Sequence, residues 1–147
     1  RIFTTYGPGA GRNQFLSAAV RKLLSPEPVA TFGNPHVKRD FVYVDDVVDA
    51  VMKCLQADLS EARNIGNQVM NIGSGTATSI REVVELLAEV LNVTKPINYD
   101  ANAFPAREGD NCHEADLANI RACLGWEPKT SLYEGLRKLV RSLDDQL

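Results

Sequence analysis

Two arginines are the residues of this chain best suited to bind an anionic ligand. Arg39 lies where a glycine-containing turn leads into a short run of β-branched and aromatic residues, and Arg107 lies in an irregular segment, residues 101–115. A guanidinium group donates two parallel hydrogen bonds to a phosphate or a carboxylate. Two such groups on separate loops could hold a diphosphate between them. The alternative for each arginine is a surface ion pair, which contributes little to stability.

The other polar candidates are an asparagine and two histidines. Asn71 is flanked by Met70 and Ile72 in a predicted strand, where its amide needs hydrogen-bond partners from backbone or ligand. His36 and His113 lie in polar loops, and no second histidine, cysteine or aspartate cluster surrounds either at a metal-ligand spacing. We therefore expect no metal site in this chain.

Two glycine-containing turns stop short of a nucleotide-binding fingerprint. Residues 7–12 read Gly-Pro-Gly-Ala-Gly-Arg, so that Arg12 stands where G-x-G-x-x-G requires its third glycine. Residues 73–75 read Gly-Ser-Gly, with Thr78 at the third position. The phosphate-binding pattern G-x-x-x-x-G-K-[ST] does not occur either. Both stretches are interpreted as tight turns.

The elements that must position these residues are short strands and helices. The patterns of apolar residues and of turn residues predict strands at 2–6, 29–32, 40–44, 68–72 and 96–99, with Arg39 in a loop between two of them. Helices are expected over 14–24, from Asp45 or Asp46 as cap to about residue 55, and after Ser79, Asp116 and Ser131. The mixture lacks a regular β-α-β repeat, so the predicted fold class is α+β with about five helices.

Two details of the helices can be checked against a structure. Ser79-x-x-Glu82 and Ser131-x-x-Glu134 are capping boxes, in which each side chain receives a hydrogen bond from the other residue's backbone. The second helix is expected to bury one apolar face. That face consists of Val47, Val48, Val51, Cys54 and Leu55.

Composition narrows the class of protein. The 147 residues suffice for one domain, and 44% hydrophobic with 24% charged residues is ordinary for a globular protein. A net charge of −3 with scattered basic residues argues against a nucleic-acid partner, and no apolar run is long enough for a membrane span. The three cysteines are too few and too scattered for a disulfide framework. We expect Cys54 and Cys123 to be buried free thiols, which fits a cytoplasmic location.

Five motifs follow one another in an order that resembles the C-terminal part of a known enzyme family. This is the extended short-chain dehydrogenase/reductase family, the NAD-dependent epimerases and dehydratases of nucleotide sugars. The motifs are RIFTTYGPG at residues 1–9, KRDFVYVDDV at 38–47, MNIGSG at 70–75, PAREGD at 105–110 and LGWEP at 124–128.

The resemblance implies an enzyme whose other half carries the chemistry. In this family a Rossmann domain binds NAD(P), and a Tyr-x-x-x-Lys pair supplies the base while the cofactor takes a hydride from the sugar. No tyrosine of this chain has lysine four residues later. We therefore expect no catalytic residue and no bound cofactor in this chain alone. Residues 1–147 would be the substrate-binding C-terminal portion, with 1–6 a remnant strand of the missing Rossmann domain.

The resemblance also implies a substrate site. The residues that it assigns to nucleotide-sugar binding are Arg39, Arg107, Asn71, Thr4, Gln14, Phe15, Thr31 and Phe32. The two arginines would grip the diphosphate, and Phe32 would lie in the strand beside the base. Thr4 departs from the family, because many members have asparagine there, which puts sugar contacts at this position in question.

Three hypotheses remain open from the sequence. The chain is the nucleotide-sugar binding portion of an epimerase, dehydratase or decarboxylase, partnered by the missing Rossmann half and cut from or encoded without it. Arg1 stands in place of a methionine and residue 2 is already in a strand, so we expect a piece of something longer, with tag removal as the alternative. The second hypothesis is a truncated, non-catalytic binding or homodimerisation module of the same descent. The third is an α+β protein of unrelated role.

Overall fold

The computed structural model describes residues 1–57, 69–102 and 112–144. Its elements are β1 (Thr4–Tyr6), α1 (Phe15–Leu24), β2 (Ala30–Phe32), β3 (Lys38–Tyr43), α2 (Val44–Gln56), β4 (Ala77–Ser79), α3 (Ile80–Val90), β5 (Ile97–Tyr99), α4 (Ala118–Leu124) and α5 (Leu132–Asp144). Five helices and five short strands over the described ranges confirm the predicted α+β class.

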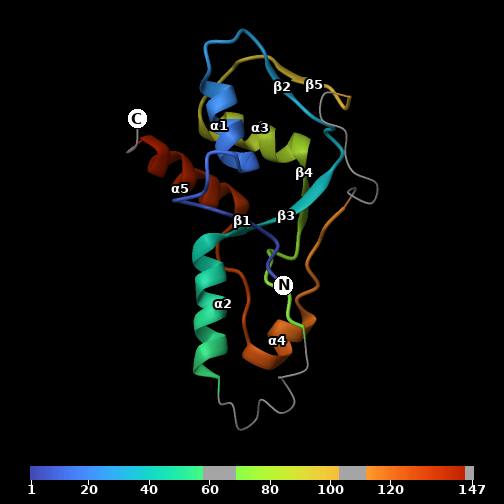
Figure 1. Ribbon diagram of the computed structural model, residues 1–147, viewed down its shortest axis with the longest axis vertical. Coiled ribbons are helices and arrows are strands. Elements are labelled where there is room, and N and C mark those ends of the chain that lie inside the picture. Colours follow the sequence, from blue (N-terminus) through green and yellow to red (C-terminus); the bar gives the residue numbers. More distant parts are fainter. Residues whose placement is uncertain (58–68, 103–111, 145–147) are drawn as a thin grey trace.

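Strand β3 is the centre of the fold. It pairs in parallel with β1, with Phe41 opposite Thr4, and antiparallel with β4, with Arg39 opposite Thr78. Strands β2 and β5 form a separate parallel pair. Figure 1 shows β1 and β3 crossing the middle of the elongated molecule, with α1, α3 and α5 on one side and α2 and α4 on the other. The strand that carries Arg39 is therefore held along both of its edges.

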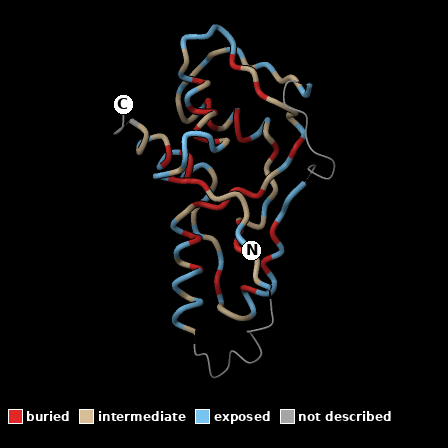
Figure 2. The backbone as a smooth tube through the Cα atoms, in the orientation of Figure 1, coloured by how far each residue is buried: buried red, intermediate tan, exposed pale blue. Residues whose placement is uncertain are grey.

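Two apolar cores lie on either side of β3. One packs α1, α3 and α5 together and includes Phe41 of β3. The other gathers around Trp126, whose side chain is 0% exposed, and includes Val42 of β3. Successive side chains of a strand point to opposite faces, so β3 can contribute neighbouring residues to both cores. Figure 2 shows the buried segments concentrated along these central elements.

The predicted capping boxes are confirmed. The Glu82 N–H donates to Ser79 Oγ at 3.2 Å, and the Ser79 N–H donates to Glu82 Oε2 at 2.7 Å. Ser131 and Glu134 make the same reciprocal pair, with both distances 3.3 Å. Gly125 ends α4 as its C-cap residue, with φ of 56° in the left-handed region that favours glycine.

The predicted start of α2 is wrong. Its N-cap residue is Tyr43, whose side chain makes no capping hydrogen bond within the described part of the chain. Asp46 is buried, and its carboxylate instead accepts the backbone N–H groups of Lys129 and Thr130 at 3.1 and 3.0 Å. A residue in a capping position along the sequence is thus used to join α2 to the chain that leads into α5.

The predicted inward face of α2 is also largely wrong. Val47 is buried, whereas Val48, Val51 and Cys54 are exposed and Leu55 is 75% exposed. A helical period shows which side chains share a face, but it does not show that the same chain covers that face. The expectation of a buried thiol therefore fails for Cys54.

Some strand predictions failed because pairing is a long-range property. Arg39 lies within β3, not in a loop beside it. The predicted strand ending at Ile72 is, over its described residues, a single parallel bridge between Ile72 and Ile2. Strand β4 was not predicted, since Ala77–Ser79 has little strand character of its own and forms by pairing with β3.

Candidate functional site

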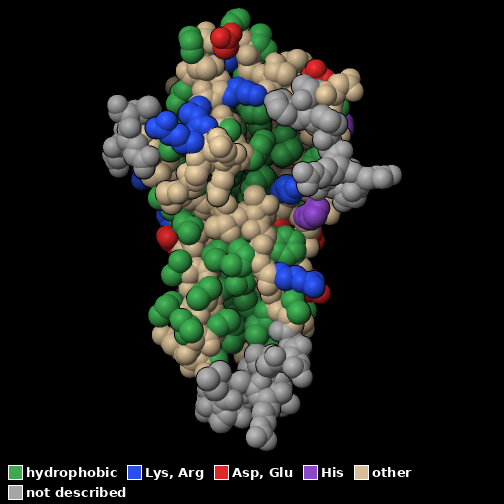
Figure 3. Space-filling model, in the orientation of Figure 1, with side chains coloured by type: hydrophobic (Ala, Val, Ile, Leu, Met, Phe, Trp, Pro, Cys, Tyr) green, Lys and Arg blue, Asp and Glu red, His purple; other side chains and the backbone are tan. Residues whose placement is uncertain are grey.

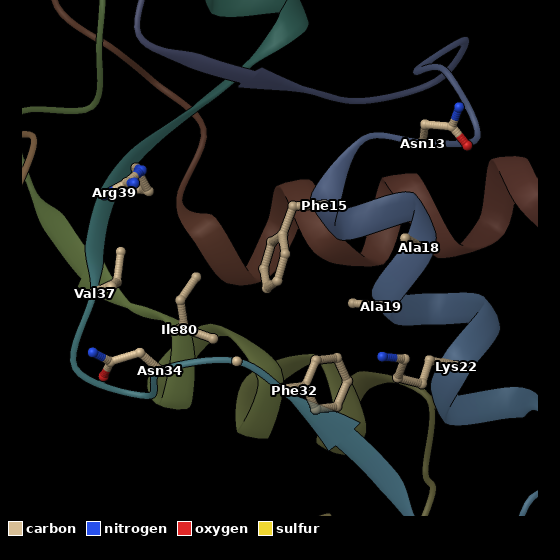
Figure 4. A pocket seen from close by; sticks show the side chains of 11 residues that line it. Asn13, Phe15, Ala18, Ala19, Lys22, Phe32, Asn34, Val37, Arg39 and Ile80 are labelled. Carbon is tan, nitrogen blue, oxygen red and sulfur yellow. The ribbon is translucent and has the colours of Figure 1, made fainter. Parts of the chain in front are cut away.

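A cavity of about 420 Å³ lies between α1, β2 and the beginning of β3. Its apolar walls include Phe15, Phe32, Val37 and Ile80, and Figure 4 shows these side chains around the opening. Lys22 and Arg39 are its charged residues, and no acid lines it among the residues that the structure describes. Aromatic walls with a positive charge suit a ligand that combines a flat apolar part with an anionic part.

Helix α1 supplies one side of this cavity. Its buried face includes Leu16, Val20 and Leu23, which pack into the core. Ala18 and Lys22 are four residues apart, so they lie one above the other on the helix surface that faces the cavity. The amphipathic pattern of α1 therefore fixes both the core packing and the direction of Lys22.

Lys22 is held against strand β2. Its ammonium group donates to the Thr31 carbonyl at 2.6 Å and lies 5.2 Å from the centre of the Phe32 ring. Figure 4 shows the amino group directed toward that ring. Lys22 was not among the residues predicted for the site. The only signal for it in the sequence is a basic residue in the last turn of α1, which is common at helix C-termini.

Arg39 is positioned by strand β3 and by contacts of its two sequence neighbours, Lys38 and Asp40. It is half-buried, and its Nη1 donates to the Lys38 carbonyl at 2.8 Å. Asp40 is 0% exposed and accepts the N–H groups of Ser74, Gly75 and Ala115 at 2.6, 2.9 and 3.1 Å. This carboxylate ties β3 to two remote segments of chain. Asp40 was not among the residues predicted for the site.

A second cavity, of about 440 Å³, adjoins the first at Phe15. It is lined in part by Thr4, Gln14 and Ser17. The Ser17 hydroxyl is buried and has no hydrogen-bond partner among the residues that the structure describes. The centres of the Phe15 and Phe41 rings lie 6.3 Å apart in a stacked arrangement. This contact holds Phe15 in the wall that the two cavities share.

The predicted site residues are distributed as follows. Phe15, Phe32 and Arg39 line the first cavity, while Thr4 and Gln14, again with Phe15, line the second. Thr31 is in neither lining, but its carbonyl accepts the hydrogen bond from Lys22, which lines the first cavity. Asn71 is in neither lining, and its amide donates to the Asp116 carbonyl at 3.0 Å. Arg107 lies outside the described residues.

Tyr6, which lines the second cavity, is a titratable group with a strongly shifted pKa. Burial, with smaller effects from Tyr43 and Asp46, raises the pKa of Tyr6 well above its ordinary range, so its phenol stays protonated. The Tyr6 hydroxyl donates to the Leu132 carbonyl at 3.4 Å. Within the ranges described, no group of His, Cys, Asp or Glu could hold a metal ion, and no helix is long and apolar enough to cross a membrane.

Known proteins are similar to this chain over most of its length. Residues 1–73 match the model of the NAD dependent epimerase/dehydratase family. A UDP-glucuronate 4-epimerase from Thermodesulfobacterium geofontis is 26% identical over 148 residues, which cover 95% of the chain and 41% of the relative. A dTDP-L-rhamnose 4-epimerase from Burkholderia thailandensis is 34% identical over 145 residues, which cover 95% of the chain and 37% of the relative. The chain spans less than half the length of these relatives.

Solved structures show the same partial match. The crystal structure of a UDP-glucose 4-epimerase from Thermotoga maritima with UDP-glucose aligns with a TM-score of 0.79 and 32% sequence identity. The alignment covers 99% of this chain and 45% of that one. The likeness therefore extends over nearly all of the present fold.

Proposed function

We propose that this chain, a relative of the C-terminal part of NAD-dependent nucleotide-sugar epimerases and dehydratases, binds the nucleotide-sugar substrate. The observation that carries the proposal is the first cavity, where Arg39 and Lys22 bring positive charge to walls built from Phe15 and Phe32. The diphosphate would bind at Arg39, and the base would enter between the apolar walls.

The diphosphate is the part of the ligand that Arg39 would hold. A phosphate oxygen accepts hydrogen bonds from a guanidinium group, and a hydrogen bond to a charged group contributes about 1.5–3 kcal/mol. From the family resemblance we propose Arg107 as the second arginine on the diphosphate and Asn71 as a residue near the phosphates.

The sugar would lie toward the second cavity. Phe15 borders both cavities, so a ligand bound in the first can extend past its ring into the second. There the Thr4 hydroxyl and the Gln14 amide offer hydrogen-bond partners to sugar hydroxyl groups. Threonine at position 4 makes fewer hydrogen bonds than the asparagine of many relatives, so the sugar contact at this position would be the weaker one.

The catalytic half is proposed to be a separate NAD(P)-binding unit that packs on α2. Val48, Val51, Met52 and Leu55 form an exposed apolar face on this helix, and Ile2 is exposed as well. Figure 3 shows hydrophobic side chains gathered over the lower half of the molecule, where α2 lies. Contiguous apolar surface of this kind marks an interface.

A non-catalytic dimerisation module remains the second candidate function, because a second copy of the chain could cover the same face of α2. Sedimentation equilibrium separates the two candidates. A dimer that persists when an NAD(P)-binding half is supplied favours the dimerisation module. A monomer that forms a one-to-one complex with that half favours the substrate-binding portion.

The substrate proposal is tested by calorimetric titration of UDP and dTDP into the chain. We expect Arg39→Ala to weaken binding by about 2–4 kcal/mol, because a charged donor to the diphosphate is lost. Arg121→Ala is the matched control, since Arg121 is exposed on α4 and pairs with Glu127 at 3.0 Å. Absence of binding by the unaltered chain, or equal affinity of the two variants, would overturn the proposal.

A further inference from the structure

Lys22 provides a second positive charge in the first cavity, away from Arg39. In Figure 4 the two cations lie on opposite sides of the cavity, with the rings of Phe15 and Phe32 between them. Arg39 belongs to β3, whereas Lys22 belongs to α1 and lies against β2. A nucleoside diphosphate that binds Arg39 through its phosphates would therefore direct its base toward Lys22. This inference rests on the function proposed above.

The position of Lys22 is fixed by two contacts with β2. The hydrogen bond of 2.6 Å to the Thr31 carbonyl and the placement 5.2 Å from the centre of the Phe32 ring hold the ammonium group beside the aromatic wall. An ammonium group has three N–H donors and no acceptor. The wall at this end thus favours an acceptor atom on a ligand and disfavours another donor.

We propose that Lys22 determines base specificity, by selecting a base that presents a carbonyl group over one that presents an amino group. Uracil and cytosine are the simplest pair to compare, because the 4-oxo group of uracil accepts a hydrogen bond whereas the 4-amino group of cytosine donates. A carbonyl facing Lys22 accepts a charge-assisted hydrogen bond, and an amino group there faces a cation that also donates. The structure therefore assigns the site to oxo-pyrimidine nucleotides.

The alternative is that Lys22 only ties α1 to β2. Lys95 offers a matched control for that role, because its ammonium group also donates to backbone at the end of α1, to the carbonyl of Ser25. Lys95 is outside the lining of both cavities. Loss of a tie between elements lowers stability in either lysine variant. Only a residue that contacts the base changes the ratio of two affinities.

The experiment measures the dissociation constants of UDP and CDP for the unaltered chain and for Lys22→Met, Lys22→Gln and Lys95→Met. We expect the unaltered chain and Lys95→Met to favour UDP by roughly 10- to 100-fold, the range expected for one hydrogen bond to a charged group. Both Lys22 variants should bring the ratio close to one. Lys22→Gln keeps a polar side chain if Lys22→Met fails to fold.

The outcomes separate this inference from the proposed function. Equal binding of UDP and CDP by the unaltered chain, with binding still dependent on Arg39, overturns the role of Lys22 and leaves the nucleotide site standing. A preference for UDP that survives in both Lys22 variants also overturns that role. Failure of both nucleotides to bind the unaltered chain overturns the proposed function and the inference together.

Discussion

Replacing Asp40 by asparagine should destabilise the fold strongly, although it only exchanges one carboxylate oxygen for an amide NH2 group. The carboxylate is fully buried, and its Oδ2 accepts the N–H groups of Gly75 and Ala115 while Oδ1 accepts that of Ser74. Asparagine has one acceptor oxygen, so at best it keeps the two hydrogen bonds at the Oδ2 position. Its NH2 group then faces the backbone N–H of Ser74, so that two hydrogen-bond donors oppose each other.

The magnitude follows from the lost hydrogen bond and from the lack of room to adjust. A hydrogen bond to a charged group contributes about 1.5–3 kcal/mol, and a buried donor left unpaired costs a similar amount. A Cβ atom at Gly73 would come within 2.8 Å of Asp40 Oδ2, so the turn packs directly on the carboxylate. Because Ser74 is only half-buried, water can replace part of the loss. We expect Asp40→Asn to lower the free energy of unfolding by about 2–3 kcal/mol.

Urea denaturation followed by circular dichroism measures this change. Asp45→Asn is the matched control, since Asp45 makes the same change of charge at an exposed position in the first turn of α2. The control should lose only about 0.3–1 kcal/mol, from its interaction with the helix dipole. Equal losses in the two variants would refute the view that the buried carboxylate holds the segments around β3 together.

Three further changes test the packing and the caps. Gly135→Ala should lower the free energy of unfolding by about 1–3 kcal/mol, although alanine has the better helix propensity, because the new Cβ would lie 2.0 Å from the Tyr6 hydroxyl. An unchanged or higher midpoint of urea denaturation would contradict this. Asp46→Asn should lower stability by about 2 kcal/mol through its two backbone hydrogen bonds, and a loss below about 0.5 kcal/mol would contradict this. Hydrogen bonds from Ser79 lower the pKa of Glu82, so its stabilisation is complete above about pH 4.3 and is lost as pH falls through the lowered folded pKa. The stability difference between the unaltered chain and Glu82→Gln should shrink on acidification, and a constant difference would count against the cap.

Local signals in the sequence were reliable where the partner residue is near in the chain. The capping boxes of Ser79 with Glu82 and of Ser131 with Glu134 formed as predicted because both partners lie within one helical turn. The sequence could not show that Leu55 would be exposed, because exposure depends on which surface covers the helix.

The candidate site divides in the same way. The family resemblance grouped Phe15, Phe32 and Arg39, and the structure lines one cavity with all three. Lys22 and Asp40 were missed because their partners are backbone groups: the Thr31 carbonyl for Lys22, and for Asp40 an N–H group as far as 75 residues along the chain. Backbone acceptors and donors have no signature in side-chain patterns, so only the fold reveals such contacts.

We propose that a nucleoside diphosphate binds in the cavity between α1, β2 and β3. Amide chemical-shift changes in the ¹⁵N-labelled chain on addition of UDP test this binding site residue by residue. We expect the largest changes at residues around that cavity, such as Ala18, Gly33 and Ile80, and no change at Gly125 beyond α4. Changes centred on α4, or no saturable changes at all, would contradict it.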